Sequence, residues 1–373
     1  MARAEIVVDL EAVRLNVATL RRRVDRPLMA VVKADAYGHG LLPCAQACLA
    51  GGADMLGVAL VDEALALRAA GITAPVLAWL AGPGERMTAA ARAGVEVSIS
   101  ATWALAELAA AGREAQRPPR VHLKFDSGLS RAGATEADWP ALVAAVASAQ
   151  SEGTVEPVAL WSHLAHADAP GHPTVDRQVR AFEAAVTVAE EGGLRGLTKH
   201  LANSAATLTR PDTWLDMVRP GIACYGLDPL GGDPSVHGLR PAMTVRAEVA
   251  LVKRLPAGSG VSYGHEYVTD RDTGLALVPI GYAEGIPRNA TNVGPVWLGG
   301  ARRRISGRVC MDQFVVDVGD DPVSAGDEVL VWGPGTRGEP TAQDWADAVD
   351  TIHYELVTRI GGRMSRRYVG GDG

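Results

Sequence analysis

The stretch Leu28-Met-Ala-Val-Val-Lys33 is a short apolar run that ends in a lysine. Apolar runs of this length predict strands that are buried on both faces, as in a parallel sheet. Similar runs recur as far as about Tyr225, and the segments between them are longer and amphipathic or Ala-rich, which is the pattern of βα units. We therefore predict strands at Leu28–Val32, Met55–Ala59, Pro75–Leu80, Val95–Ile99, Arg120–Phe125, Pro157–Ser162, Thr198–Leu201 and Met217–Val218.

These βα units predict a (β/α)8 barrel. A doubly wound sheet is the alternative, but no G-x-G-x-x-G sequence follows an early strand, which removes the dinucleotide-binding version of that fold. Beyond His237-Gly-Leu-Arg-Pro241 the chain changes to Val- and Ile-rich runs divided by Gly and Pro. This change predicts a mostly β second domain, and we place the barrel at residues 1–238 and the β domain at residues 239–373.

The second domain contains one predicted helix, Thr341–Val349, which Thr341 can cap and in which Asp344 stands in the first turn. The first apolar run of the chain, Ile6–Val8, could belong to either domain. A helix follows it, with one apolar face formed by Val13, Val17, Leu20 and Val24. The predicted strands of the second domain are Met243–Lys253, Leu275–Ile280, Val296–Leu298, Val315–Val318 and Glu328–Val331.

Charge and composition exclude several classes of protein. The net charge of −7 is spread along the chain without a basic stripe, so we expect no nucleic-acid partner. No apolar run reaches membrane-spanning length and no signal-peptide pattern opens the chain, which predicts a cytoplasmic protein without membrane contact. Cys44 and Cys48 stand four residues apart in an apolar pattern typical of buried free thiols. His163 and His166 have metal-like spacing, but no carboxylate set completes a site, so we expect no metal.

Residues that follow the strands of a barrel are the first candidates for chemistry, because active sites of barrels lie at the carboxyl ends of the strands. Lys33 is such a residue, and it is one of only four lysines, with Lys124, Lys199 and Lys253. A buried ammonium costs free energy unless it is paired, neutralised or used covalently. On position alone, a lysine that emerges into solvent is the simpler interpretation.

The surrounding string, Ala30-Val-Val-Lys33-Ala-Asp-Ala-Tyr37-Gly-His-Gly40, changes that interpretation because it resembles the cofactor-lysine signature of the alanine racemase family. Members of that family are barrels followed by a β domain, so the resemblance implies the fold that the apolar runs also predict. Further strings similar to the family follow in the same order along the chain. They are Lys124-Phe-Asp-Ser-Gly-Leu-Ser-Arg131-Ala-Gly, Trp161-Ser-His163, His200-Leu-Ala-Asn203-Ser204-Ala-Ala, Val218-Arg219-Pro-Gly221-Ile222-Ala-Cys-Tyr-Gly226, Val261-Ser-Tyr263-Gly, Gly281-Tyr282-Ala-Glu-Gly285, Gly307-Arg-Val-Cys310-Met311-Asp312-Gln313 and Tyr354-Glu.

The resemblance implies that pyridoxal 5'-phosphate is the cofactor and that Lys33 carries it. A lysine of depressed pKa can be both nucleophile and proton carrier, while the cofactor takes up the electrons left when an amino acid loses its α-proton. By the same resemblance, Lys33 exchanges the proton of D-alanine and Tyr263 exchanges that of L-alanine, one on each face of the substrate. His163 is implied to lie against the pyridine ring, and Arg219 to pair with its nitrogen and keep it largely unprotonated.

The remaining site residues are implied in the same way. Loops after the last two strands of a barrel can present backbone N–H groups to a phosphate. Lys124 matches a lysine that many members carry as a CO2 adduct, and a salt bridge to Asp126 is the alternative for it. The residues implied to bind the cofactor phosphate are Tyr37, Asn203, Ser204, Gly221, Ile222 and Tyr354, and those implied to bind the substrate are Arg131, Met311 and Tyr282.

The implied activity is interconversion of L- and D-alanine, which in the family most often supplies D-alanine for peptidoglycan. A serine or broad-specificity racemase remains an alternative, because a methyl and a hydroxymethyl group differ little in a small pocket. A decarboxylase of the same fold would need an acid in place of Arg219, and a cofactor-holding regulatory barrel would lack the domain that bears Tyr263. The resemblance also implies a head-to-tail homodimer whose active sites are shared between subunits.

Overall fold

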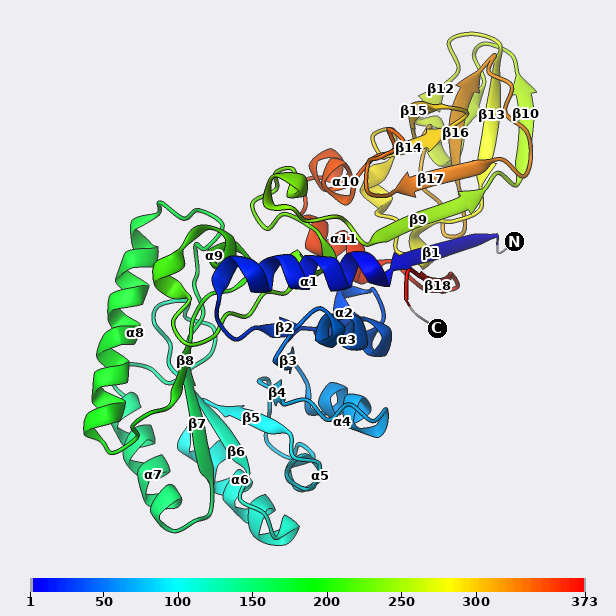
Figure 1. The fold of residues 1–373 in the computed structure, drawn as a ribbon. Helices are drawn as coiled ribbons and strands as arrows, with labels where there is room; N and C mark the ends of the chain where they lie inside the picture. The colour runs from blue at the N-terminus through cyan, green and yellow to red at the C-terminus, as the bar shows by residue number, and fades with distance from the viewer. Residues whose placement is uncertain (1–2, 372–373) are drawn as a thin grey trace.

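The computed structural model describes residues 3–371, in which a curled parallel sheet wrapped by helices adjoins a mostly β region (Figure 1). The parallel sheet has seven strands, arranged in chain order. Its strands are largely buried, as expected for strands covered on both faces, although several of them include polar residues. They are β2 (Met29–Val31), β3 (Met55–Val58), β4 (Val76–Ala78), β5 (Glu96–Ile99), β6 (Arg120–Lys124), β7 (Glu156–Trp161) and β8 (Thr198–His200).

The predicted eighth strand, Met217–Val218, is reduced to two isolated parallel bridges that connect β8 with the start of β2. Met217 pairs with His200, and Val218 pairs with Leu28. Pairing cannot extend much further because Pro220, two residues on, has no N–H to donate. The bridges nevertheless close the sheet, so the predicted barrel is confirmed with an eighth position that is shorter than a regular strand.

Helices cover the outer face of the curled sheet (Figure 1). Most of them follow strands and bury one face, as in α1, whose predicted apolar residues are all buried, whereas the short α2 is a left-handed turn and not a regular helix. The helices of this region are α1 (Leu10–Val24), α2 (Lys33–Tyr37), α3 (Leu41–Ala50), α4 (Val61–Ala69), α5 (Met87–Arg92), α6 (Thr102–Ala115), α7 (Trp139–Ser151), α8 (Pro173–Glu191) and α9 (Ser204–Thr209).

The second region contains a six-stranded sheet of order β15-β14-β17-β9-β1-β18, a three-stranded sheet of order β10-β13-β16 and a hairpin of β11 and β12. The first strand of the chain, β1, lies in this region, where it pairs antiparallel with β9 and parallel with β18. The bounds are β1 (Ala4–Asp9), β9 (Met243–Glu248), β10 (Leu251–Leu255), β11 (Gly260–Val261), β12 (Tyr267–Val268), β13 (Thr273–Val278), β14 (Pro295–Leu298), β15 (Ala301–Arg304), β16 (Phe314–Gly319), β17 (Glu328–Trp332) and β18 (Ser365–Val369).

Two details of this region differ from the sequence-based expectation. The single predicted run Met243–Lys253 is divided between β9 and β10, which lie in different sheets. The division falls where the N–H of Val249 donates to Asp327 and that of Ala250 donates to Leu277, so the chain passes from one sheet to the other. The predicted helix is confirmed as α10 (Ala342–Val349) and is followed by a second, unpredicted helix, α11 (His353–Arg359).

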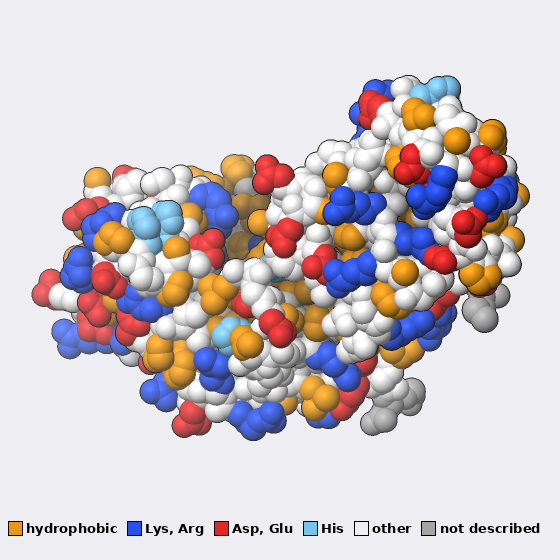
Figure 2. Space-filling model, turned by 90° about the horizontal axis from the view of Figure 1, so that it is seen from above, with side chains coloured by type: hydrophobic (Ala, Val, Ile, Leu, Met, Phe, Trp, Pro, Cys, Tyr) orange, Lys and Arg blue, Asp and Glu red, His pale blue; other side chains and the backbone are white. Residues whose placement is uncertain are grey.

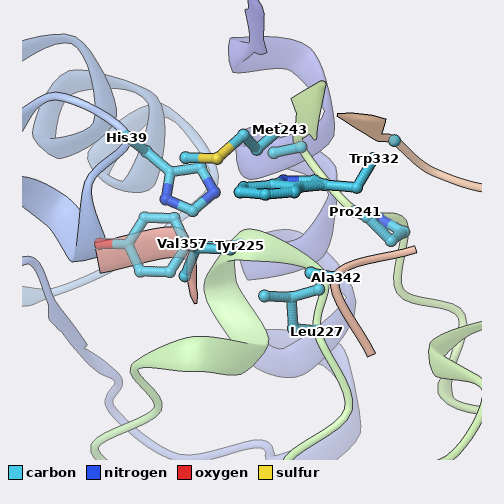
Figure 3. A pocket seen from close by; sticks show the side chains of 10 residues that line it. His39, Tyr225, Leu227, Pro241, Met243, Trp332, Ala342 and Val357 are labelled. Carbon is cyan, nitrogen blue, oxygen red and sulfur yellow. The ribbon is translucent and has the colours of Figure 1, made fainter. Parts of the chain in front are cut away.

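The loop after Lys33 packs against the β region. His39 stacks on Tyr225 with ring centroids 4.5 Å apart, and these two rings share a small cavity with Met243 of β9 and Trp332 of β17 (Figure 3). All four side chains are buried. The position of the β region is therefore linked to the segment that carries Lys33.

The described helices include none that is long and apolar enough to cross a membrane. On the face seen in Figure 2, basic and acidic side chains are interspersed rather than gathered into a patch of one sign.

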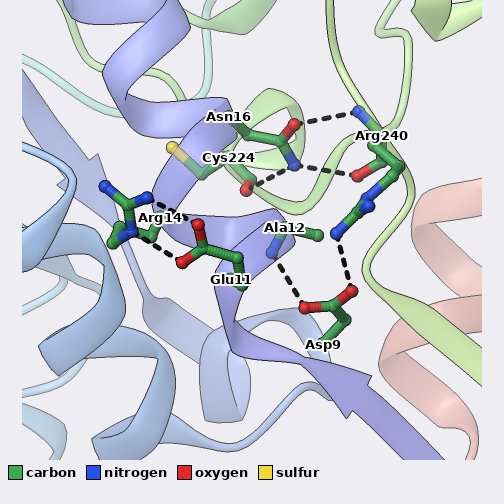
Figure 4. A network of polar contacts seen from close by, with 7 residues as sticks. All are labelled: Asp9, Glu11, Ala12, Arg14, Asn16, Cys224 and Arg240. Atoms are coloured by element: carbon green, nitrogen blue, oxygen red, sulfur yellow. Dashed lines mark hydrogen bonds and ion pairs between the residues drawn. The ribbon is translucent and has the colours of Figure 1, made fainter. Parts of the chain in front are cut away.

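Helix α1 is joined to the end of the barrel by one buried amide. The Nδ2 group of Asn16 donates to the carbonyls of Cys224 (3.3 Å) and Arg240 (2.9 Å), and its Oδ1 accepts from the N–H of Arg240 (2.9 Å) (Figure 4). At the start of the same helix, Asp9 caps the N–H of Ala12 and also pairs with the Arg240 side chain. Cys224 lies in the 3-10 helix η2 (Ile222–Tyr225), so α1 supports the loop that carries Gly221 and Ile222.

We predict that Asn16→Leu lowers the free energy of unfolding by about 2–4 kcal/mol, because three largely buried backbone groups lose their partner. Urea unfolding of the purified protein measures this change. Arg22→Ala, on the exposed face of the same helix, is the control and is expected to change the free energy by no more than about 0.5 kcal/mol. Equal effects of the two substitutions would contradict the role given to Asn16.

Candidate active site

Lys33 lies two residues after the end of β2 and begins α2, at the carboxyl end of the barrel. Its side chain is half-buried, and its Nζ lies 5.8 Å from the ring centroid of Tyr37 and 5.8 Å from that of Trp79. Burial lowers the pKa of the amine, the positive charge of Arg131 lowers it further, and the Glu63 carboxylate opposes the change. A larger fraction of this amine is therefore uncharged, and able to act as a nucleophile, than for a lysine in water.

The turn after Lys33 has an unusual backbone that the surrounding structure holds in place. Left-handed conformations of non-glycine residues cost roughly 1–2 kcal/mol each. Glu63 accepts a hydrogen bond from the N–H of Ala34 (2.6 Å), and Arg366 of β18 pairs with Asp35 (2.7 Å) and donates to the carbonyl of Gly38 (3.0 Å). The residues with φ between 53° and 54° are Ala34, Asp35, Ala36 and Tyr37. The position of Lys33 thus depends on contacts from α4 and from the C-terminal strand.

A second group of residues surrounds the end of the barrel's last strands. The ring of Tyr37 is buried and lies 6.3 Å from the ring of Tyr354 of α11. The hydroxyl of Tyr37 approaches Gly221 so closely that a Cβ at position 221 would lie 2.2 Å from it. Ser204 Oγ accepts a hydrogen bond from the N–H of Gly221 (2.8 Å) and lies 3.4 Å from that of Ala223. Hydroxyl groups and backbone N–H groups therefore converge on one small region.

Asn203 and Ile222 flank this region. The side chain of Asn203 caps α9 by accepting from the N–H of Ala206 (3.1 Å). Ile222 is buried and begins the 3-10 helix η2, directly after Gly221. The predicted phosphate-binding residues are thus brought together from four separate segments of the chain.

Positive groups gather around Trp161 of β7. Lys124 Nζ lies 4.3 Å from the ring centroid, and the central carbon of the Arg219 guanidinium, Cζ, lies 4.9 Å from it. Burial lowers the pKa of Lys124 to about 8, with a further contribution from Arg219 and Arg131. Burial also lowers the pKa of His163 well below its usual range, and the positive charge of Arg219 adds to the effect, so this imidazole is neutral at physiological pH.

The hydrogen bonds of this group define its arrangement. Arg219 donates to the carbonyls of Ser162 (2.8 Å) and Leu201 (3.2 Å), and one of its nitrogens lies 3.4 Å from Nδ1 of His163. The alternative salt bridge of Lys124 to Asp126 does not occur within residues 3–371. Instead, one oxygen of Asp126 accepts from three successive N–H groups, those of Gly128, Leu129 and Ser130, at 2.9 to 3.1 Å. These bonds shape the loop that leads to the exposed Arg131.

The remaining predicted residues form a separate group on the β region. Tyr263 begins the 3-10 helix η4 (Tyr263–His265), and its side chain is 72% exposed. Tyr282 and Met311 are also exposed, and the N–H of Tyr282 and the side chain of Ser262 both reach Cys310, which connects the three segments. Within the described residues, no hydrogen bond or ring contact connects this group with Lys33. Figure 1 places β12, which pairs with the strand before Tyr263, well away from β2.

Sequence reasoning did not assign several residues that the structure places at the site. Trp79 and Glu63 face Lys33, and Trp161 packs against Lys124 and Arg219. Arg219 also contacts His200, which stands in one of the family-like strings but has no role predicted from the sequence. The sequence did contain a signal for polar side chains inside the barrel. Arg120, His122 and Lys124 alternate along β6, and every second residue of a barrel strand points inward.

Polar and positively charged groups at the carboxyl ends of the strands of a closed barrel define the chain as an enzyme of the (β/α)8 class. Comparison with known proteins narrows this class. Family models for the alanine racemase N-terminal domain and the alanine racemase C-terminal domain match residues 8–229 and 242–368. The chain belongs to the alanine racemase family.

Individual relatives agree with the family match. An alanine racemase of Frankia casuarinae is 60% identical over 97% of this chain and 95% of its own length. A crystal structure of alanine racemase from a D-cycloserine-producing Streptomyces lavendulae has a TM-score of 0.98 and 54% identity, covering 100% of this chain and 98% of that one. Alanine racemase from Bartonella henselae, described as having covalently bound pyridoxal phosphate, has a TM-score of 0.89 and 28% identity, covering 99% of this chain and 100% of that one.

Proposed function

We propose that this chain is a pyridoxal-phosphate-dependent alanine racemase in which Lys33 and Tyr263 are the two proton-transfer groups. The placement of Lys33 supports this most directly. It is an amine of lowered pKa at the carboxyl end of a barrel strand, beside a cradle of hydroxyl and backbone N–H groups. The chain's membership of the alanine racemase family names the reaction.

The cradle fits the phosphate of this cofactor. Gly221 is required where it stands, because any side chain would collide with the hydroxyl of Tyr37. The phosphate would be held by Tyr37, Tyr354, Ser204 and the backbone at Gly221, together with Asn203 and Ile222 in the flanking loops. The cofactor of the Bartonella relative is described as covalently bound, in accord with a reactive lysine beside the cradle. When bound, the cofactor supplies an electron sink for the carbanion that forms at the α-carbon of the substrate.

The proton-transfer groups must stand on opposite faces of that carbon. Lys33 Nζ would take up or return the α-proton on one face, the proton of D-alanine, and Tyr263 Oη would do so on the other face, the proton of L-alanine. His163, which is neutral, would lie against the cofactor ring. Arg219, which is buried and positively charged, would face the ring nitrogen and, as a permanent donor, leave that nitrogen without a proton.

The substrate carboxylate requires positive or N–H groups near the reacting carbon. Arg131 is exposed on the loop after β6 and lies close enough to Lys33 to lower its pKa, so it is placed to bind this carboxylate. Met311 and Tyr282 would complete the substrate site from the β region. We further propose that Lys124 carries CO2 as a carbamate, since its pKa of about 8 leaves a larger fraction of the amine uncharged than for a lysine in water and Asp126 is engaged elsewhere.

The exposed position of Tyr263 leads us to propose a head-to-tail homodimer with shared active sites. One chain contains two half-sites, a barrel group around Lys33 and a β-region group of Tyr263, Tyr282 and Met311, with no hydrogen bond or ring contact between them among the described residues. In a symmetric dimer, each barrel group would face the β-region group of the other subunit. Tyr263 of the partner subunit would then complete the site of Lys33.

We also propose a division of the chain at residues 238 and 239, with β1 in the sheet of the second domain. The biological role that best accords with the proposed activity is supply of D-alanine for peptidoglycan in the cytoplasm.

The proposed activity predicts that purified protein interconverts L- and D-alanine and that added pyridoxal phosphate restores activity lost when the cofactor is removed. The two directions should give the same equilibrium mixture, since the enantiomers have equal free energy. Serine, offered as a competing substrate, should be turned over more slowly. Release of CO2 or of pyruvate as the main product would contradict the proposal, as would faster turnover of serine than of alanine.

The shared site predicts that two inactive variants complement each other. Lys33→Ala and Tyr263→Ala should each be inactive alone. After subunit exchange, an equal mixture of the two should show about a quarter of wild-type activity, because half of the dimers are mixed and each mixed dimer has one intact site. The measurement is alanine racemisation before and after mixing.

The matched control for this experiment mixes Lys33→Ala with Arg219→Ala, whose defects lie in the same half-site, so that no intact site can form. A mixture of Lys33→Ala and Tyr263→Ala that stays inactive although mixed dimers are demonstrated would refute the shared site.

A further inference from the structure

A chain of buried side chains runs through the barrel interior to Arg219. Glu96 Oε2 lies 2.6 Å from Nε2 of His122, Nδ1 of His122 lies 3.0 Å from Nε2 of His200, and Nδ1 of His200 lies 3.0 Å from Nη1 of Arg219. All four side chains are at least nine-tenths buried. Glu96 begins β5 whereas Arg219 follows the last strand position, so the chain of contacts extends from the amino end of the barrel to its carboxyl end.

The chemistry of the two ends dictates where the protons lie. Arg219 can only donate, so Nδ1 of His200 must accept. Burial, Arg219 and His122 together hold the pKa of His200 well below its usual range, so its single proton is on Nε2 and is donated to Nδ1 of His122. The proton of His122 is then on Nε2 and is donated to Glu96, which as a carboxylate can only accept. Every hydrogen bond in the chain therefore points from Arg219 toward Glu96.

Glu96 is the one carboxylate in this series of hydrogen-bonded side chains. Among residues 3–371, no carboxylate lies within ion-pair distance of Arg219, whose partners are two carbonyls and two neutral imidazoles. Burial by itself would raise the pKa of Glu96, but the hydrogen bond from His122 and the positive charges around it hold the pKa below its usual value. The carboxylate therefore stays ionised, and it also forms an ion pair with Arg120.

We propose that Glu96 is a positioning residue for Arg219 and acts through His122 and His200. With the carboxylate present, His200 always offers a lone pair to Arg219. Without it, His122 can move its proton to Nδ1 and donate to His200, whose proton then moves to Nδ1 and faces the Arg219 donor. Such a donor–donor contact displaces the guanidinium. The inference rests on the proposed function only in that Arg219 faces the ring nitrogen of the cofactor.

Neutron diffraction from crystals of the deuterated wild-type holoenzyme tests the proton positions directly. The expected result is deuterium on Nε2 of both His122 and His200 and on neither Nδ1. Deuterium on Nδ1 of His200, or on both nitrogens of either ring, would overturn the proposal. This measurement does not depend on activity. A holoenzyme that fails to racemise alanine would contradict the proposed function, whereas the deuterium positions would still test the proposed role of Glu96.

Kinetics of variants test the consequence for Arg219. We expect Glu96→Leu to lower kcat for alanine by about tenfold while KM changes less than about twofold, because the displaced group faces the cofactor and not the substrate carboxylate. Glu96→Gln keeps an oxygen that accepts from His122 and is expected to restore most of kcat. A general loss of packing would instead change kcat, KM and the thermal midpoint together, and would not be rescued by the amide.

Glu156→Gln is the matched control, because Glu156 is an exposed carboxylate that pairs with the same Arg120 but does not contact His122. Its kcat is expected to equal that of the wild type. A Glu96→Leu protein with unchanged kcat, or with the same change as Glu156→Gln, would refute the proposal. If Glu96→Leu does not fold, the kcat of Glu96→Gln and the neutron result test the proposed role of Glu96 instead.

Discussion

Four positively charged groups share the carboxyl end of one barrel, and their burial, reinforced by their mutual repulsion, determines the chemistry that the site can perform. Burial is the largest cause of the lowered pKa values of Lys33, Lys124 and His163, and each of the four cations, Lys33, Lys124, Arg131 and Arg219, lowers the pKa of at least one neighbour further. The result is a pair of amines that lose protons more easily than lysines in water, and a neutral His163. A lysine that is to attack a carbonyl group needs this loss of charge, which an isolated surface lysine does not have.

The fold holds these charges in place by contacts from distant parts of the chain. The left-handed turn after Lys33 is held by Glu63 of α4 and by Arg366 of β18, near the C-terminus. The buried Arg219 is held by carbonyls and by the imidazole of His200, behind which His122 and Glu96 extend to the opposite end of the barrel. The β region, which includes the first strand of the chain, thus supports the barrel site directly while its own candidate residues face solvent.

Much of this arrangement could be predicted from the sequence, because apolar runs of strand length and helical periodicity are local signals. The barrel, the β domain and the helix capped by Thr341 follow from them. The family-like strings located the residues around Lys33, Tyr37 and Arg219, which the structure then brings together.

Other features had no local signal. The four successive left-handed residues after Lys33 include no glycine, so tertiary contacts impose that backbone against its intrinsic preference. The eighth strand is cut short by Pro220, and β9 and β10 divide a run that looks continuous in the sequence. Glu96 and His122 stand in short strands where a polar residue has no evident partner, and only the closed barrel shows that their partners lie on β6 and β8.

The central claim is that Lys33 is the amine that forms the covalent bond to the cofactor. Borohydride reduction of the holoenzyme makes that bond permanent, and peptide mapping by mass spectrometry then locates the modified residue. The account predicts that the modification is on Lys33. Lys253, an exposed lysine that serves as the comparison, is expected to be unmodified. Modification of Lys124, Lys199 or Lys253 in place of Lys33, or of no lysine at all, would contradict it.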